Sequence, residues 1–197
     1  MIIKKYEVIN LPFDKKISEL TEKEARLFNK WFADQIPIRR KILKEYIKSE
    51  DKELFSKLDF SPESLLVLGK WFETKISTMK MTKEERKRER ENLGEFSMFV
   101  KPKKWTFTEE TFSLFFDIGI YFGTVFTKKF KIVKWTYVTK PKNYVDRNWP
   151  ILSGFKTNLN PVRLVDVLAN QLLDRTQNYS RLKELYQIWE KFLIHKK

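Results

Sequence analysis

The chain has 197 residues, with 40 Lys and Arg against 26 Asp and Glu, one His, no Cys and a formal net charge of +14. The lack of Cys excludes disulfides, thiolate zinc sites, iron–sulfur clusters and cysteine nucleophiles. The single His195, near the end of the chain, excludes any site that needs two imidazoles. Because 42% of the residues are hydrophobic, the composition predicts a folded domain with a sizeable core.

The apolar segments of the sequence indicate in which cellular compartment the protein is expected. The first residues carry no apolar run typical of a signal peptide. The most apolar stretch, 112–126, contains Asp117 and is shorter than the roughly 20 residues that a bilayer span needs. We therefore expect a cytoplasmic protein without membrane contact, in which this stretch forms a buried helix.

The N-terminal part predicts a strand followed by helices. Residues 2–13 are rich in apolar side chains and are expected to form the strand, which ends near a proline. Thr21 and Glu24 have the spacing of a capping box, so a helix is expected to begin there. Pro37 is expected to end or kink this helix and is well placed to open a second one.

The next part of the chain predicts a further helix and then a change in composition. Ser61 is placed to cap a helix over 61–76. Thr82 and Glu85 then repeat the capping-box spacing, but 83–92 contains no apolar residue. A helix that is polar all round is either surrounded by solvent or marginally formed.

The charged segment bears on the domain organisation. We expect a single domain over 1–197. The composition also allows a division into a helical part, 1–78, a charged connection, 79–96, and a second part, 97–197. Which of the two holds is left open by the sequence.

The C-terminal half predicts a long apolar helix, a hairpin and two more helices. Thr106 is expected to cap the apolar helix. The remaining expected elements are a short strand over 96–102, the apolar helix over 107–127, strands over 130–138 and near 151–155, a helix opened by Asn160 and Pro161, and a last helix over about 179–194. The predicted fold class is α+β, helix-dominated, with a small antiparallel sheet or hairpin packed among amphipathic helices.

Asp117 is the one acidic residue inside an apolar helix. A buried carboxylate needs a partner or becomes neutral through a raised pKa. Asp117 is therefore a general acid or base, a metal ligand, or a structural anchor, and the lack of an acidic residue on 130–138 favours the anchor. As an anchor it would pair with backbone N–H groups or with one of four arginines: Arg39, Arg40, Arg147 or Arg163. Gly119 and Gly123, four residues apart on the same helix, are expected to let another part of the chain approach closely.

No motif for catalysis is present. The chain has no glycine-rich phosphate loop and no nucleophile elbow. His195 is a poor general base because of its place in the terminal residues. We expect a protein that is not an enzyme, with no catalytic residue, no metal and no cofactor.

The basic residues are densest over 128–147, which has seven Lys and Arg against Asp146 alone. The candidate binding residues are Lys128, Lys129, Lys131, Lys134, Lys140, Lys142, Tyr144, Arg147 and Trp149. Such a segment can hold nucleic-acid phosphates and stack bases, or it can meet an acidic protein. It can also be a solvated face whose lysines prevent strand-to-strand association.

A resemblance to other proteins bears on the choice among these functions. The pattern Asp117-x-Gly119-x-Tyr121-x-Gly123 on an apolar helix, followed by a strand with Trp135, resembles uncharacterised bacterial proteins, some of which look like immunity proteins of toxin systems. Where those proteins often have Glu after the last glycine, this chain has Thr124. The resemblance implies a bacterial origin and an intracellular binding role, and it carries over no functional residues.

These observations define two hypotheses about function. The first is a non-enzymatic, bacterial, cytoplasmic protein that binds another protein, an acidic one among the options, and is immunity-like. The alternative is a nucleic-acid-binding protein that uses the basic, aromatic segment 128–149. The sequence leaves the oligomeric state open.

Overall fold

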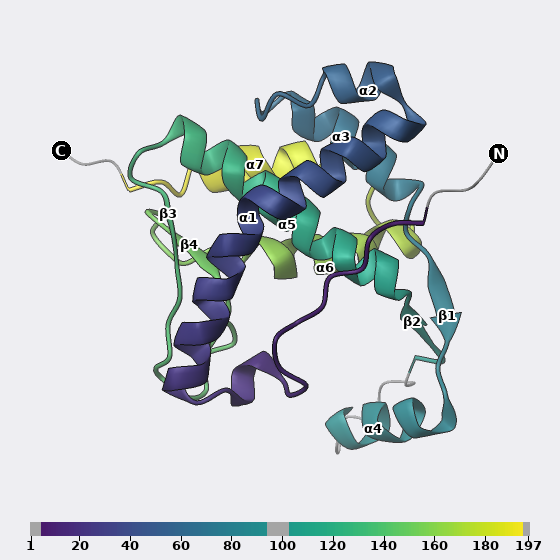
Figure 1. Cartoon of the computed structure of the whole chain (residues 1–197), viewed down its shortest axis with the longest axis vertical. Helices are drawn as coiled ribbons and strands as arrows, with labels where there is room; N and C mark the ends of the chain where they lie inside the picture. The colour runs from purple at the N-terminus through teal and green to yellow at the C-terminus, as the bar shows by residue number, and fades with distance from the viewer. Residues whose placement is uncertain (1–4, 94–102, 195–197) are drawn as a thin grey trace.

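The computed structural model describes residues 5–93 and 103–194, and this part is a helix-dominated α+β fold, as predicted (Figure 1). Its helices are α1 (Glu22–Glu50), α2 (Lys52–Ser56), α3 (Ser64–Glu73), α4 (Lys83–Leu93), α5 (Glu109–Lys129), α6 (Pro161–Leu173) and α7 (Arg181–Glu190), preceded by a 3₁₀ turn, η1 (Ile17–Glu19). Its strands are β1 (Thr78–Lys80), β2 (Trp105–Phe107), β3 (Lys134–Thr136) and β4 (Ile151–Ser153).

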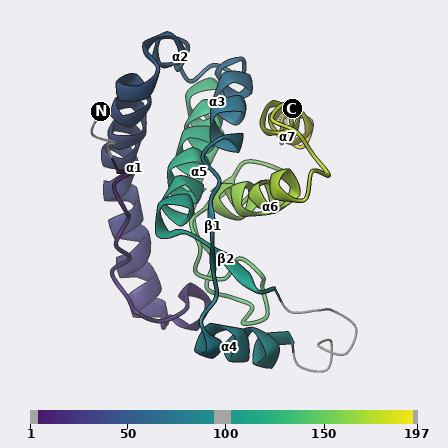
Figure 2. The same ribbon diagram turned by 90° about the vertical axis from the view of Figure 1, so that its right-hand side faces the viewer.

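Helix α5 is the centre of the fold. Its side chains are buried without interruption over 113–126. Helix α1 packs along one side of α5 and α6 crosses the other, while α3 packs on α7 (Figure 2). Within the described ranges, no helix is long and apolar enough to cross a bilayer. The most apolar stretch of the sequence is thus a core helix, as predicted.

The N-terminal and C-terminal parts share one core. A single cluster of buried side chains includes Phe32 and Phe72 from the first part and Phe122, Val165 and Tyr186 from the second. The helices of both parts therefore bury their apolar faces against the same set of residues.

Pro37 lies inside α1 and does not divide it. Of the two outcomes expected at this point, an end or a kink, the end is wrong, and so is the start of a second helix. The helix axis changes direction about midway in Figure 1, as is typical of a proline within a helix. Phe32 and Leu43, on either side of the proline, are both buried in the core, so packing holds the helix together where the proline removes a hydrogen bond.

The N-terminal segment is extended, but the expected strand over 2–13 is wrong for the described residues 5–13. No strand lies beside it in that part. Its contacts are instead with side chains: the Ile9 N–H donates to Ser113 Oγ (2.9 Å), and the Glu7 carbonyl accepts from Arg39 Nη2 (2.8 Å). A pattern of apolar residues indicates extension, but pairing depends on a partner strand.

Two small antiparallel sheets are present in the described part, of which one was expected. Strands β3 and β4 pair with Trp135 opposite Leu152, which confirms the predicted hairpin in shorter form. Strands β1 and β2 pair with Met79 opposite Thr106. Thr106 is therefore a strand residue, and the expected cap at this position is wrong: Thr108 caps α5 by accepting from the Thr111 N–H.

The other predicted helix starts have mixed outcomes. The capping box of Thr82 and Glu85 is confirmed at α4 (2.7 and 3.1 Å), and Asn160 caps α6. Ser61 does not cap α3, which begins at Ser64 after a turn in which the Ser61 hydroxyl accepts from the Ser64 N–H (3.2 Å). The strand expected over 96–102 lies outside the described residues.

Gly119 and Gly123 both lie where another element comes close. A Cβ on Gly119 would sit 3.0 Å from backbone atoms of Val162 in α6. A Cβ on Gly123 would overlap the indole of Trp135, which packs edge-on against Phe32 (5.1 Å). The small residues thus allow α6 and the β3 tryptophan to reach the surface of α5.

Gly69 provides a test of how tightly α3 and α7 meet. A Cβ at this position would overlap the backbone carbonyl oxygen of Tyr179, which cannot rotate away. We expect Gly69→Ala to lower the free energy of unfolding by about 1–3 kcal/mol, although alanine is the better helix former. Urea denaturation measures this, with Lys70→Ala, an exposed neighbour, as the control within about 0.5 kcal/mol. Equal stabilities of the two variants would contradict the close approach.

Candidate functional site

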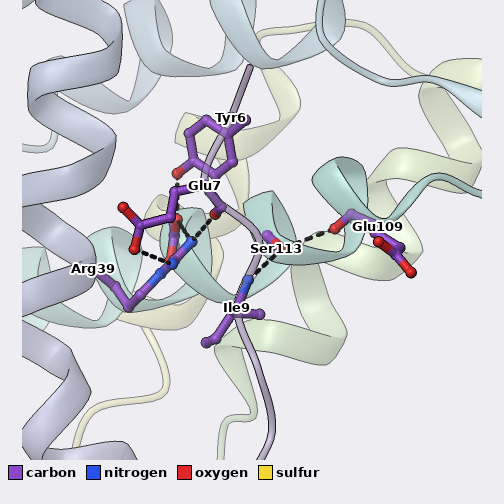
Figure 3. Close-up of polar contacts among 7 residues, drawn as sticks. Tyr6, Glu7, Ile9, Arg39, Glu109 and Ser113 are labelled. Atoms are coloured by element: carbon purple, nitrogen blue, oxygen red, sulfur yellow. Dashed lines mark hydrogen bonds and ion pairs between the residues drawn. The ribbon is translucent and has the colours of Figure 1, made fainter. Parts of the chain in front are cut away.

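A buried polar cluster joins α1, α5 and the N-terminal segment (Figure 3). Asp117 of α5 is fully buried. Arg39 of α1 donates to both of its carboxylate oxygens, from Nε to Oδ1 at 2.8 Å and from Nη2 to Oδ2 at 2.7 Å. The Tyr6 hydroxyl donates to Oδ2 as well. Of the four arginines that the sequence offered, Arg39 is thus the partner of Asp117.

The same cluster fastens the N-terminal segment to the helices. Arg39 Nη2 also donates to the Glu7 carbonyl, and the Glu7 carboxylate lies 3.7 Å from Nη1. Two residues further along, the Ile9 N–H donates to Ser113, whose hydroxyl donates to the Glu109 carbonyl at 2.8 Å. These contacts replace the strand pairing that the segment lacks.

Burial controls the ionisation of the cluster. It raises the pKa of Asp117 to about 6, against the hydrogen bonds from Arg39 and Tyr6 that favour the carboxylate. Burial also raises the pKa of the Tyr6 hydroxyl well above its usual value, with the Asp117 charge adding to the effect. For Arg39, burial lowers the pKa, but the hydrogen bonds and charge of Asp117 outweigh it, so the net shift is upward. The pair is therefore ionised at neutral pH.

The cluster is closed to a substrate. The exposed fractions of Tyr6, Arg39 and Asp117 are 5%, 2% and 0%. No group of three or more His, Cys, Asp or Glu side chains in the described ranges is arranged to hold a metal ion. The geometry is that of a structural anchor, in which every charge is used to hold backbone and side chains together.

The candidate residues of segment 128–149 do not form one surface. Lys129 pairs with Glu190 (2.8 Å), and Lys140 pairs with Glu22 (3.5 Å). Arg147 donates to the backbone carbonyls of Thr139 (3.0 Å) and Ser18 (3.1 Å). These three cations are thus engaged in contacts within the molecule.

The remaining residues of the segment differ in exposure. The Trp149 ring lies 6.1 Å from that of Phe116 and is packed against the core, while the Tyr144 hydroxyl accepts from Asn158 (3.4 Å). All six lysines of the segment are exposed, and four of them have no carboxylate of the described residues within 4.0 Å: Lys128, Lys131, Lys134 and Lys142. One of them, Lys128, faces helix α1 rather than the hairpin.

Lys128 belongs to a groove on the outer side of α1. This basic groove, of about 450 Å³, is lined by Pro37, Arg40, Lys41, Lys44, Glu45, Lys48, Phe55, Phe60 and Lys128. Five of its nine residues are cationic and one is acidic. Lys41 pairs with that acid, Glu45 (3.8 Å), whereas no carboxylate in the described part lies within 4.0 Å of the other four cations.

The cations of the groove lie over two phenyl rings. Arg40, Lys44 and Lys128 lie 5.4, 5.4 and 4.4 Å from the centre of the Phe60 ring. Lys44 and Lys48 each lie 5.2 Å from the centre of the Phe55 ring. A ring face attracts a cation, so the rings gather charges that would otherwise repel one another.

Phe60 is held in an unusual backbone conformation. Its φ of 66° is in the left-handed region, which an aromatic residue rarely adopts and which costs on the order of 1–3 kcal/mol. Its N–H donates to the Tyr121 hydroxyl (3.0 Å), which in turn donates to Ser64 Oγ (2.8 Å), and the two rings stack at 4.5 Å. The core thus fixes Phe60 at the floor of the groove.

Sequence reasoning missed the groove. One signal was present, since Arg40, Lys44 and Lys48 recur every four residues and so share a helix face. The other walls come from Phe60 and Lys128, whose approach to α1 depends on the tertiary fold. Searches against family models, curated proteins and solved structures find no match for the chain.

Removal of the counter-ion tests the anchor. In Arg39→Met, Asp117 stays buried without its cation, and we expect the free energy of unfolding to fall by about 3–5 kcal/mol. The neighbouring Arg40→Met removes a half-buried cation that has no such partner, so a loss below about 1 kcal/mol is expected. Urea denaturation compares the two. A cost at Arg40 equal to that at Arg39 would contradict the special role of the pair.

The ionisation of Asp117 gives a pH test. Because its pKa in the folded chain, about 6, lies above the ordinary 3.8, the folded state takes up a proton that the unfolded state does not. Its contribution to stability is therefore full below about pH 4 and is lost as the pH rises through about 6. Titration of the side-chain carboxyl ¹³C shift should show a midpoint near 6. A midpoint below 4 would mean that Arg39 outweighs burial.

Proposed function

We propose that the protein is a non-enzymatic binding protein that recognises an acidic protein through the basic groove. One observation carries the proposal: four cations converge on Phe55 and Phe60 with no carboxylate of the described residues within 4.0 Å. Each of these cations lies within 5.4 Å of the centre of a ring that it shares with another cation, and the Debye length at physiological ionic strength is about 8 Å, so the repulsion between neighbouring cations is incompletely screened. An acidic partner would relieve it.

The composition of the groove favours a protein over a nucleic acid. Base stacking needs a free ring face, but cations lie over Phe55 and Phe60. From Pro37 to Lys48 the groove runs along roughly 16 Å of helix, a length that suits a short acidic segment.

We retain the bacterial cytoplasm and the immunity-like role that the resemblance implies. The binding surface proposed here is the basic groove instead of segment 128–149. Segment 128–149 contributes Lys128 to the groove, while Lys129, Lys140 and Arg147 are engaged elsewhere. The binding face is thus assigned to the outer side of α1, with the end of α5 beside it.

Charge reversal tests whether the partner binds to the basic groove or to the hairpin. In Lys44→Glu/Lys48→Glu the groove loses its attraction, and we expect the complex captured from the cells that make the protein to weaken at least about tenfold at low salt. Lys134→Glu/Lys142→Glu makes the same change in charge on the hairpin and should leave the complex intact. Capture is quantified by affinity purification after nuclease treatment, with circular dichroism to show that both variants are folded.

Two results would contradict the proposal. Equal capture by both double variants would show that the groove is not the binding face. Loss of the captured partner on nuclease treatment would favour the alternative, a nucleic acid held by the same charges.

A further inference from the structure

We infer that the Phe60 end of the basic groove is a binding site for a phosphoryl group. The inference rests on the proposed function in that it describes one end of the same groove. Arg40, Lys44 and Lys128 all lie within 5.4 Å of the centre of one ring, that of Phe60. The three cations come from two helices that are far apart in the sequence.

Helix periodicity does not account for this convergence. Arg40 and Lys44 follow one another on α1, but Lys128 lies in the last turn of α5. A cation is favourable near the carboxyl end of a helix. Lys128 would satisfy this preference whether or not its side chain pointed toward Phe60. The neighbouring Lys129 pairs with Glu190 instead.

One face of the Phe60 ring is covered by Tyr121, which stacks on it with the ring centres 4.5 Å apart. The hydrogen bond from the Phe60 N–H to the Tyr121 hydroxyl holds the backbone of Phe60 on the core side. The cations therefore gather on the side that faces the groove, over a floor that does not need to move when a ligand arrives.

The charge and donor count match a phosphoryl group better than a single carboxylate. A phosphorylated side chain carries close to two negative charges and three acceptor oxygens at neutral pH. Arg40 offers a planar fork for two of them, and Lys44 and Lys128 offer point charges. Asp59, next to Phe60, has a lowered pKa chiefly because Ser61 donates hydrogen bonds to its carboxylate, with the charge of Lys44 as a smaller cause.

The test uses the whole purified chain and inorganic phosphate as the probe. Calorimetric titration at constant ionic strength compares wild type with Lys128→Met and with Lys131→Met, an exposed lysine three residues further on. We expect the dissociation constant for phosphate to rise at least about tenfold in Lys128→Met and to stay within twofold in Lys131→Met. An acidic peptide with one phosphoserine, and the same peptide unphosphorylated, form the second arm.

Each outcome bears on the inference. Preference for the phosphopeptide over both other probes assigns the phosphoryl group to a protein, and equal affinity for phosphate and phosphopeptide assigns it to a small phosphorylated molecule. Phosphate binding no stronger than chloride, or an equal loss in the two variants, overturns the site. That failure leaves the proposed function intact if reversal at Lys44 and Lys48 still releases the acidic partner.

Discussion

The ion pair between Arg39 and Asp117 is the contact on which the arrangement of the molecule depends. Two charges that are almost wholly removed from water cost several kcal/mol each unless their geometry is good. Here the guanidinium meets both carboxylate oxygens, and Nη2 also donates to the Glu7 carbonyl, so the cost is offset only when α1, α5 and the N-terminal segment are all in place. An alternative packing of α1 on α5 would leave a buried charge alone.

The orientation that buries Arg39 also creates the basic groove. Neighbouring residues on a helix point about 100° apart, so when Arg39 faces the core with Leu43 and Ile47, Arg40 faces away with Lys44 and Lys48. The proline at 37 lies at the start of this stretch, where the helix axis changes direction. The anchor and the groove are therefore two faces of the same stretch, 37–48, and the position of one determines the position of the other.

The features that the sequence predicted correctly are ones that local interactions determine. The capping boxes at Thr21 and Thr82, the cap at Asn160 and the buried helix around Asp117 follow from contacts within a few residues, and the structure confirms them. The partner of Asp117 is 78 residues away, and four arginines satisfied the same chemical need. Pro37 shows the opposite failure, since its local preference for a helix end is overridden by the burial of α1 on both sides of it.

The basic segment shows why charge density along a chain is a poor guide to a surface. Segment 128–147 has a net charge of +6 in 20 residues, but folding brings Glu190 to Lys129, Glu22 to Lys140 and two carbonyls to Arg147. Helix α1 has a lower net charge because it also carries five acidic residues, yet its cations Arg40, Lys44 and Lys48 line one groove with Lys128. An attraction for an anionic partner depends on the charges that folding leaves uncompensated. Folding leaves Lys131, Lys134 and Lys142 of the segment without a carboxylate of the described residues within 4.0 Å as well. The groove differs in that its four such cations are gathered over two phenyl rings.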